Sequence, residues 1–108
     1  MTDALSLTGA QRSLLRSAAR RLDVSVVLGK GGLSEQAVAH AAGVLGSHEL
    51  IKVRLLESAA DDRRAAAEAL AEALGAAVVD VIGRVVVLYR PNPLLPEKER
   101  IHLPKSTD

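Results

Sequence analysis

A cluster of glycines around one lysine has the clearest chemical meaning in this sequence: Gly29-Lys30-Gly31-Gly32. A β-branched run from Val24 to Leu28 precedes the cluster, and a helical pattern from Glu35 to Leu45 follows it. The glycines therefore lie where a strand passes into a helix. Glycine lets another chain approach the backbone closely, and a helix start offers unpaired N–H groups. With the charge of Lys30, this stretch predicts a seat for a phosphate group.

Arginines extend the candidate site into the preceding segment. Arg12, Arg16 and Arg20 recur every four residues and share one face of a predicted helix. The stretch from Thr8 to Leu33 holds five basic residues against one acid, whereas Leu56 to Gly75 holds five acids against two bases. This asymmetry favours a polyanionic partner, and the alternative is an ordinary surface with an uneven distribution of charge.

The spacing of the polar residues does not match known catalytic or metal sites. Lys30 is followed by Gly31, not by the serine or threonine of a P-loop, and Ser34 stands where a dinucleotide fingerprint needs its third glycine. The pair His48-Glu49 lacks a second histidine at position 52, and the chain has no cysteine. We therefore predict no enzyme, no metal, no cofactor and no small-molecule substrate.

The sequence also predicts the elements that position these residues. Thr8 and Gln11 fit a capping box that opens a helix running to about Leu22. The apolar face of this helix is predicted from residues at helical spacing, Leu14, Leu15, Ala18 and Leu22. Ser34 is a suitable N-cap for the second helix, and Gly46 with Ser47 suits its end.

Strand patterns fill much of the second half. From Leu50 to Leu55 apolar residues alternate with Lys52 and Arg54, which places these two bases on one face of a strand. A third helix is predicted from about Asp61 to Leu74, ending at Gly75. Gly83-Arg84 then joins two strands as a tight hairpin, and the second of these strands is apolar on both faces and should be central.

The predicted order αβαβαββ describes an α/β protein of the two-layer α+β type, with three helices and a four-stranded mixed sheet. We expect a flexible N-terminus over 1–7, one domain over 8–103 with a short edge strand at Ile101–Leu103, and a frayed tail over 104–108. Tyr89 is the only aromatic residue, and packing is favoured over base stacking for its side chain.

A short G-x-x-G loop clamps the nucleic-acid backbone in KH domains, and Gly29 to Gly32 fits that pattern. Taken with three further stretches, it resembles the CRM domain (chloroplast RNA splicing and ribosome maturation) in its bacterial stand-alone, YhbY-like form. The four stretches are the arginine helix, Val26 to Ser34, His48 to Val53, and Val81 to Pro91.

The resemblance implies a fold similar to the C-terminal domain of bacterial translation initiation factor three. It also implies binding of ribosomal RNA in large-subunit precursors through the G-x-x-G loop and an adjoining basic surface. By position, the loop is Gly29 to Gly32, and Lys52, Arg84 and Arg90 match basic positions of the family motifs.

Two other functions are possible on the sequence. The acidic third helix, from Asp61 to Glu72, could be the contact with a ribosomal protein or assembly factor. A small hydrolase is a distant third possibility, because no nucleophile, base or metal set can be named. The chain has no signal peptide and no apolar run long enough for a membrane span, so we expect a cytoplasmic monomer without a membrane partner.

Overall fold

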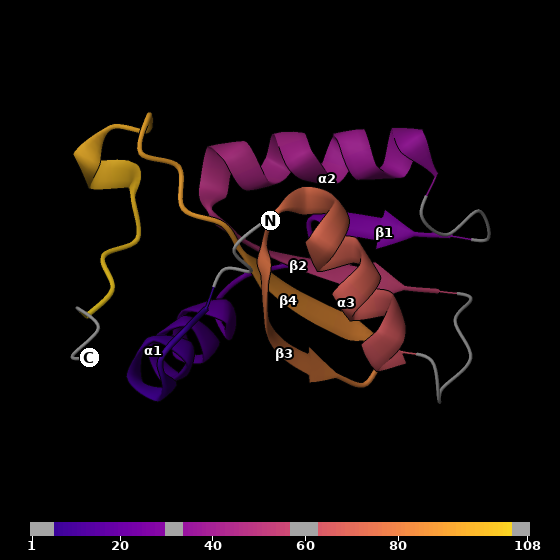
Figure 1. The fold of residues 1–108 in the computed structure, drawn as a ribbon, viewed down its shortest axis with the longest axis horizontal. Helices are drawn as coiled ribbons and strands as arrows, with labels where there is room; N and C mark the ends of the chain where they lie inside the picture. Colours follow the sequence, from indigo (N-terminus) through magenta and orange to yellow (C-terminus); the bar gives the residue numbers. More distant parts are fainter. Residues whose placement is uncertain (1–5, 30–33, 57–62, 105–108) are drawn as a thin grey trace.

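In the part of the chain that the structure describes, three α-helices each precede a strand of a four-stranded sheet, and a hairpin supplies the last strand (Figure 1). The computed structural model describes residues 6–29, 34–56 and 63–104. The elements are α1 (Gly9–Ala19), β1 (Val26–Leu28), α2 (Glu35–His48), β2 (Leu50–Leu55), α3 (Arg63–Leu74), β3 (Ala77–Ile82), β4 (Val85–Tyr89) and a 3-10 helix, η2 (Glu97–Glu99). The predicted fold, αβαβαββ with a mixed sheet, is confirmed.

The sheet has the strand order β1-β2-β4-β3. β1 runs parallel to β2, as a helical crossover requires, and β4 is antiparallel to both of its neighbours. The hairpin between β3 and β4 turns at Gly83, whose φ of 57° suits the tight turn. The prediction that Val85 to Leu88 forms a central strand is therefore confirmed.

The larger part of the core lies between the sheet and the pair α2 and α3. Ile51, Val53 and Leu55 of β2 point to this side, as their alternation predicted. Both helices contribute mostly alanine and leucine, because the chain has almost no aromatic residues with which to fill the space. Their buried members are Ala41, Leu45, Ala67, Leu70, Ala71 and Leu74.

α1 covers the opposite face of the sheet, and it covers only part of it. Leu15 and Ala19 pack there against residues of three strands, Leu50, Val79, Val87 and Tyr89. The predicted helix end at about Leu22 is wrong, because α1 stops at Ala19 and the chain turns to enter β1. Leu14 and Leu22 are correspondingly 39% and 37% exposed and do not belong to the buried face.

Helix capping was largely predictable from local sequence. Thr8 and Gln11 form the full capping box, and the Ser34 hydroxyl accepts a hydrogen bond from the N–H of Ala37. α2, however, does not end at Gly46 and Ser47 but continues to His48, and Glu49 takes the left-handed position with a φ of 65°. This conformation is uncommon for a residue with a side chain.

Contacts of the Glu49 side chain explain why it stands there. Its carboxylate is fully buried and accepts hydrogen bonds from the N–H groups of Asn92 (2.5 Å) and Ile101 (2.6 Å) and from Nε of Arg100 (3.2 Å). Charged hydrogen bonds of this kind offset the strain at its backbone. They also hold the C-terminal segment against the end of α2. The predicted edge strand at Ile101–Leu103 is wrong, because this segment has an irregular backbone and does not pair with the sheet.

Candidate nucleic-acid interface

Four basic side chains gather on the half of the sheet that α1 leaves open. We call this group the basic strip, and it consists of Arg16 of α1, Arg20 at the C-cap of α1, and Lys52 and Arg54 of β2. The alternation of β2 places Lys52 and Arg54 on this face, since Ile51, Val53 and Leu55 fill the core on the other.

Two adjoining grooves connect the members of the strip. One is lined by Arg16, Arg20 and Lys52 together with Ile82 of β3. The other is lined by Lys52 and Arg54, again with Ile82, and by the segment from Leu22 to Val24 that follows α1. Lys52 and Ile82 belong to both grooves, so the arginine helix and the sheet share one continuous surface.

Two acids border these grooves and lower their positive charge. Nε of Arg16 lies 3.4 Å from the Asp80 carboxylate, and Asp23 lines the second groove. Against the four bases of the strip, these two acids leave an excess of two positive charges on the groove walls. The guanidinium of Arg20 and the ammonium of Lys52 have no hydrogen-bond or ion-pair partner among residues 6–29, 34–56 and 63–104.

The strip continues toward the end of the sheet where the glycine loop begins. Arg54 is the register partner of Val27, two residues before Gly29. At the same end, the N–H of Leu56 donates to the Leu28 carbonyl, and the Arg84 carbonyl accepts from Leu55. Arg84 is exposed, and its guanidinium donates to the Leu56 carbonyl at 2.6 Å. The structure thus places Gly29 and Arg84 at the same end of the sheet as Arg54.

The conformation of Gly29 bears on its predicted role. Gly29 is exposed, its φ is not in the left-handed region, and a Cβ placed on it would meet no atom within 4 Å. A side chain is therefore sterically possible at this position, and the benefit of glycine there is the open approach that it leaves for another chain. Lys30, Gly31 and Gly32 lie outside the described residues.

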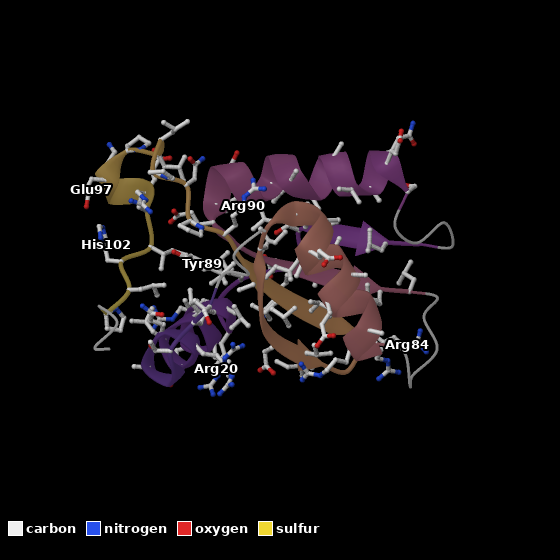
Figure 2. All side chains as sticks on the ribbon, viewed as in Figure 1. Arg20, Arg84, Tyr89, Arg90, Glu97 and His102 are labelled. Carbon is white, nitrogen blue, oxygen red and sulfur yellow. The ribbon has the colours of Figure 1, made fainter. Side chains whose placement is uncertain are left out.

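Arg12 and Arg90 lie apart from the strip. Nη1 of Arg12 donates to the carbonyls of Val78 and Val79 on β3, so this side chain joins α1 to the sheet. Arg90 donates from Nη1 to the Leu74 carbonyl and from Nη2 to the Ala42 carbonyl, which joins the end of α3 to α2. Figure 2 shows Arg90 beside α2, well separated from Arg20 and Arg84. RNA contact by either residue stays a prediction, and the geometry favours a structural role for both.

Sequence reasoning did not include Arg54 among the candidate site residues. The signal was present, because Arg54 alternates with the core residues of β2 in step with Lys52. A helix that continued to Leu22 would have extended farther over this face of the sheet. Because α1 ends at Ala19, Arg54 lies on the part of the face that stays open.

Two other polar groups have structural positions. Tyr89 is 4% exposed in the cluster under α1, so the prediction that it packs is confirmed. Burial, together with the nearby charge of Glu49, raises the pKa of the Tyr89 hydroxyl. For Glu49 itself, burial acts to raise the pKa, but the hydrogen bonds from Asn92, Ile101 and Arg100 outweigh it and hold that pKa below its ordinary value.

Among residues 6–29, 34–56 and 63–104, no three His, Asp or Glu side chains come together as a possible metal site. None of the helices in these ranges combines the length and the apolar character that crossing a membrane requires.

The fold and the basic strip together define a small α+β domain whose sheet carries a strip of basic residues. Residues 7–90 match the profile of the CRS1 / YhbY (CRM) domain, and the chain belongs to this family. It is 37% identical over 98 residues to a Bacillus subtilis protein named "Probable RNA-binding protein YqeI", covering 91% of this chain and 99% of that one. An "RNA-binding protein" from Haemophilus influenzae is 34% identical, with 94% of this chain and 98% of the relative covered.

A solved structure agrees with the fold. The solution structure of SAV1595 from Staphylococcus aureus superposes with a TM-score of 0.78 at 39% sequence identity. The match covers 92% of this chain and all of that one. The arrangement of three helices on a four-stranded mixed sheet is therefore shared with a relative of similar size.

Proposed function

We propose that this chain is a non-enzymatic RNA-binding protein that contacts the RNA backbone through the basic strip and the glycine loop. The observation that supports the proposal is the pair of adjoining grooves that connects Arg20, Lys52 and Arg54, at the end of the sheet where Gly29 and Arg84 also lie. The names of the two bacterial relatives support RNA as the ligand. Positive charges at fixed spacing on a groove attract phosphates without reading sequence.

The RNA that we propose is ribosomal RNA in precursors of the large subunit, bound in the cytoplasm by a monomer. This assignment rests on the family resemblance of the glycine loop and the basic motifs. Lys30 would neutralise a phosphate, and Gly29 would let the strand approach the loop.

Variants at Gly29 test the proposal sharply, because the position has room for a side chain. We expect Gly29→Asp to bind large-subunit ribosomal RNA fragments about tenfold more weakly, a loss of roughly 1.4 kcal/mol, since it adds a negative charge where phosphates approach. Gly29→Ala is the matched control and should bind almost as well as the unchanged protein. Equal affinity of the folded Asp variant would remove the loop from the interface.

The alternative is a protein-docking module. Glu68 and Glu72 lie one turn apart on the exposed side of α3, whose other side packs in the core. This acidic face would suit a basic protein partner. Binding to pre-ribosomal particles that survives nuclease treatment and is lost in Glu68→Lys or Glu72→Lys would favour this alternative over the RNA proposal.

A further inference from the structure

The open half of the sheet carries exposed apolar side chains between its charges. Val27 and Ile82 are 54% and 60% exposed, and Leu22, at the rim of the second groove, is 37% exposed. Single exposed apolar residues are common on protein surfaces. Here Ile82 and Leu22 line grooves that also hold Lys52 and Arg54, and Val27 is the register partner of Arg54. This combination suits a ligand with both apolar and anionic parts.

The register of the strands sets out this surface in two rows. Lys52, Val87 and Asp80 are successive partners across β2, β4 and β3. In the next row, Val27, Arg54, Val85 and Ile82 are partners across all four strands. α1 packs beside the first row, whereas the second row lies beyond the end of the helix. An extended ligand that lies along the second row would contact Val27 at one end and Ile82 at the other, with the guanidinium of Arg54 beside Val27.

RNA strands offer such chemistry only when their bases are unpaired. A duplex presents phosphates and riboses on its outside and keeps the faces of its bases stacked inside. A single strand exposes base faces that most often stack on aromatic side chains while its phosphates meet basic ones. Since the chain has one aromatic residue and it is buried, aliphatic side chains must supply these contacts here.

We infer that the open half of the sheet, bounded by Leu22, Val27 and Ile82, is a seat for the bases of unpaired nucleotides, so that the chain selects single-stranded over double-stranded RNA. The inference rests on the proposed function and specifies its ligand. Lys52 and Arg54, which both lie on β2 between the apolar residues at the two ends of the row, hold the phosphates of the seated nucleotides. The aliphatic contacts add affinity without a strong preference for one base.

Fluorescence anisotropy with a labelled oligouridine of about 12 nucleotides tests the inference, with the same strand annealed to oligoadenosine as the duplex probe. The unchanged protein should bind the single strand more tightly than the duplex. Ile82→Ser should weaken single-strand binding about fivefold, because the buried apolar area is lost, and leave duplex binding unchanged. Ile82→Thr keeps the β-branched shape and serves if the serine variant does not fold.

The matched control is Leu94→Ser, since Leu94 is 90% exposed on the C-terminal segment away from the strip. It should bind both probes like the unchanged protein. Equal binding of single strand and duplex, or an Ile82 variant that binds the single strand normally, would overturn the inference and leave the proposed function standing. Failure to bind any RNA, large-subunit fragments included, would instead count against the proposed function.

Discussion

Nε of Arg16 lies 3.4 Å from the carboxylate of Asp80, across the groove between α1 and the sheet. The two side chains are 47% and 27% exposed, so water screens their attraction and the pair adds little to stability. The pair matters more for binding, because the negative charge of Asp80 offsets part of the attraction between Arg16 and a polyanion.

Removal of the Asp80 charge should strengthen RNA binding. We expect Asp80→Asn to bind a single-stranded RNA several-fold more tightly and to steepen the slope of log K against log salt by about 0.7, as one further phosphate contact would. Glu72→Gln makes the same change in charge on exposed α3 and is the control. Equal gains in both variants would point to net charge alone and not to the groove.

Replacement of Arg12 should affect stability and replacement of Arg20 should affect RNA binding, although both arginines belong to the same series spaced by four residues. Arg12→Ala removes hydrogen bonds to the Val78 and Val79 carbonyls and should lower the free energy of unfolding by about 1–3 kcal/mol. Arg20→Ala should leave that free energy nearly unchanged and weaken RNA binding, because Arg20 is exposed on the strip. Urea unfolding and an RNA titration on both variants measure the two effects, and a binding loss confined to Arg12→Ala would contradict the placement of the strip.

Arg90 should also act on stability. Its guanidinium holds the Leu74 carbonyl at the end of α3 and the Ala42 carbonyl of α2, so Arg90→Ala should cost about 1–3 kcal/mol of unfolding free energy. RNA affinity, measured at a temperature where the variant remains folded, should stay the same. Arg84→Ala, at the edge near Gly29, is the comparison and should reduce affinity with little effect on unfolding. If Arg90→Ala were as stable as the unchanged protein but bound RNA poorly, Arg90 would have to contact RNA directly, which contradicts this prediction.

Glu49 should make stability depend on pH. Its pKa in the folded protein lies below the ordinary value of 4.5, so its contribution is present above pH 4.5 and is lost as the pH falls through the folded pKa. We expect Glu49→Gln to be about 2 kcal/mol less stable than the unchanged protein at pH 7, with the difference shrinking as the pH falls below 4.5. Chemical unfolding at a series of pH values measures this, and a constant difference would show that the charge of Glu49 does not matter.

Local patterns in the sequence were enough to predict most of the fold. The alternation of β2, the capping box at Thr8 and the turn at Gly83 each depend on residues close together in the chain. Such signals are read from spacing alone, because the backbone geometry of each element repeats. The parallel pairing of β1 with β2 and the antiparallel pairing of β3 with β4 followed from the crossover helix and the final hairpin, whereas the order β1-β2-β4-β3 was seen only in the structure.

Features set by distant contacts could not be predicted in this way. The partners of the Glu49 carboxylate lie 43, 51 and 52 residues farther along the chain, and no spacing rule connects them. The equal spacing of Arg12, Arg16 and Arg20 predicted one shared role. In the structure, Arg12 donates to carbonyls of β3 and Arg16 pairs with Asp80. The three arginines therefore differ in how far their charge is available to a ligand.

The salt dependence of RNA binding tests the basic strip most directly, in the unchanged protein, in Lys52→Gln and in Lys98→Gln. Lys52 lies on the strip, whereas Lys98 is exposed on η2 in the C-terminal segment and controls for the loss of one lysine. We predict that Lys52→Gln lowers the slope of log K against log salt by about 0.7 for a single strand and that Lys98→Gln leaves it unchanged. A slope that is flat in the unchanged protein, or the same in all three, would contradict RNA binding by this surface.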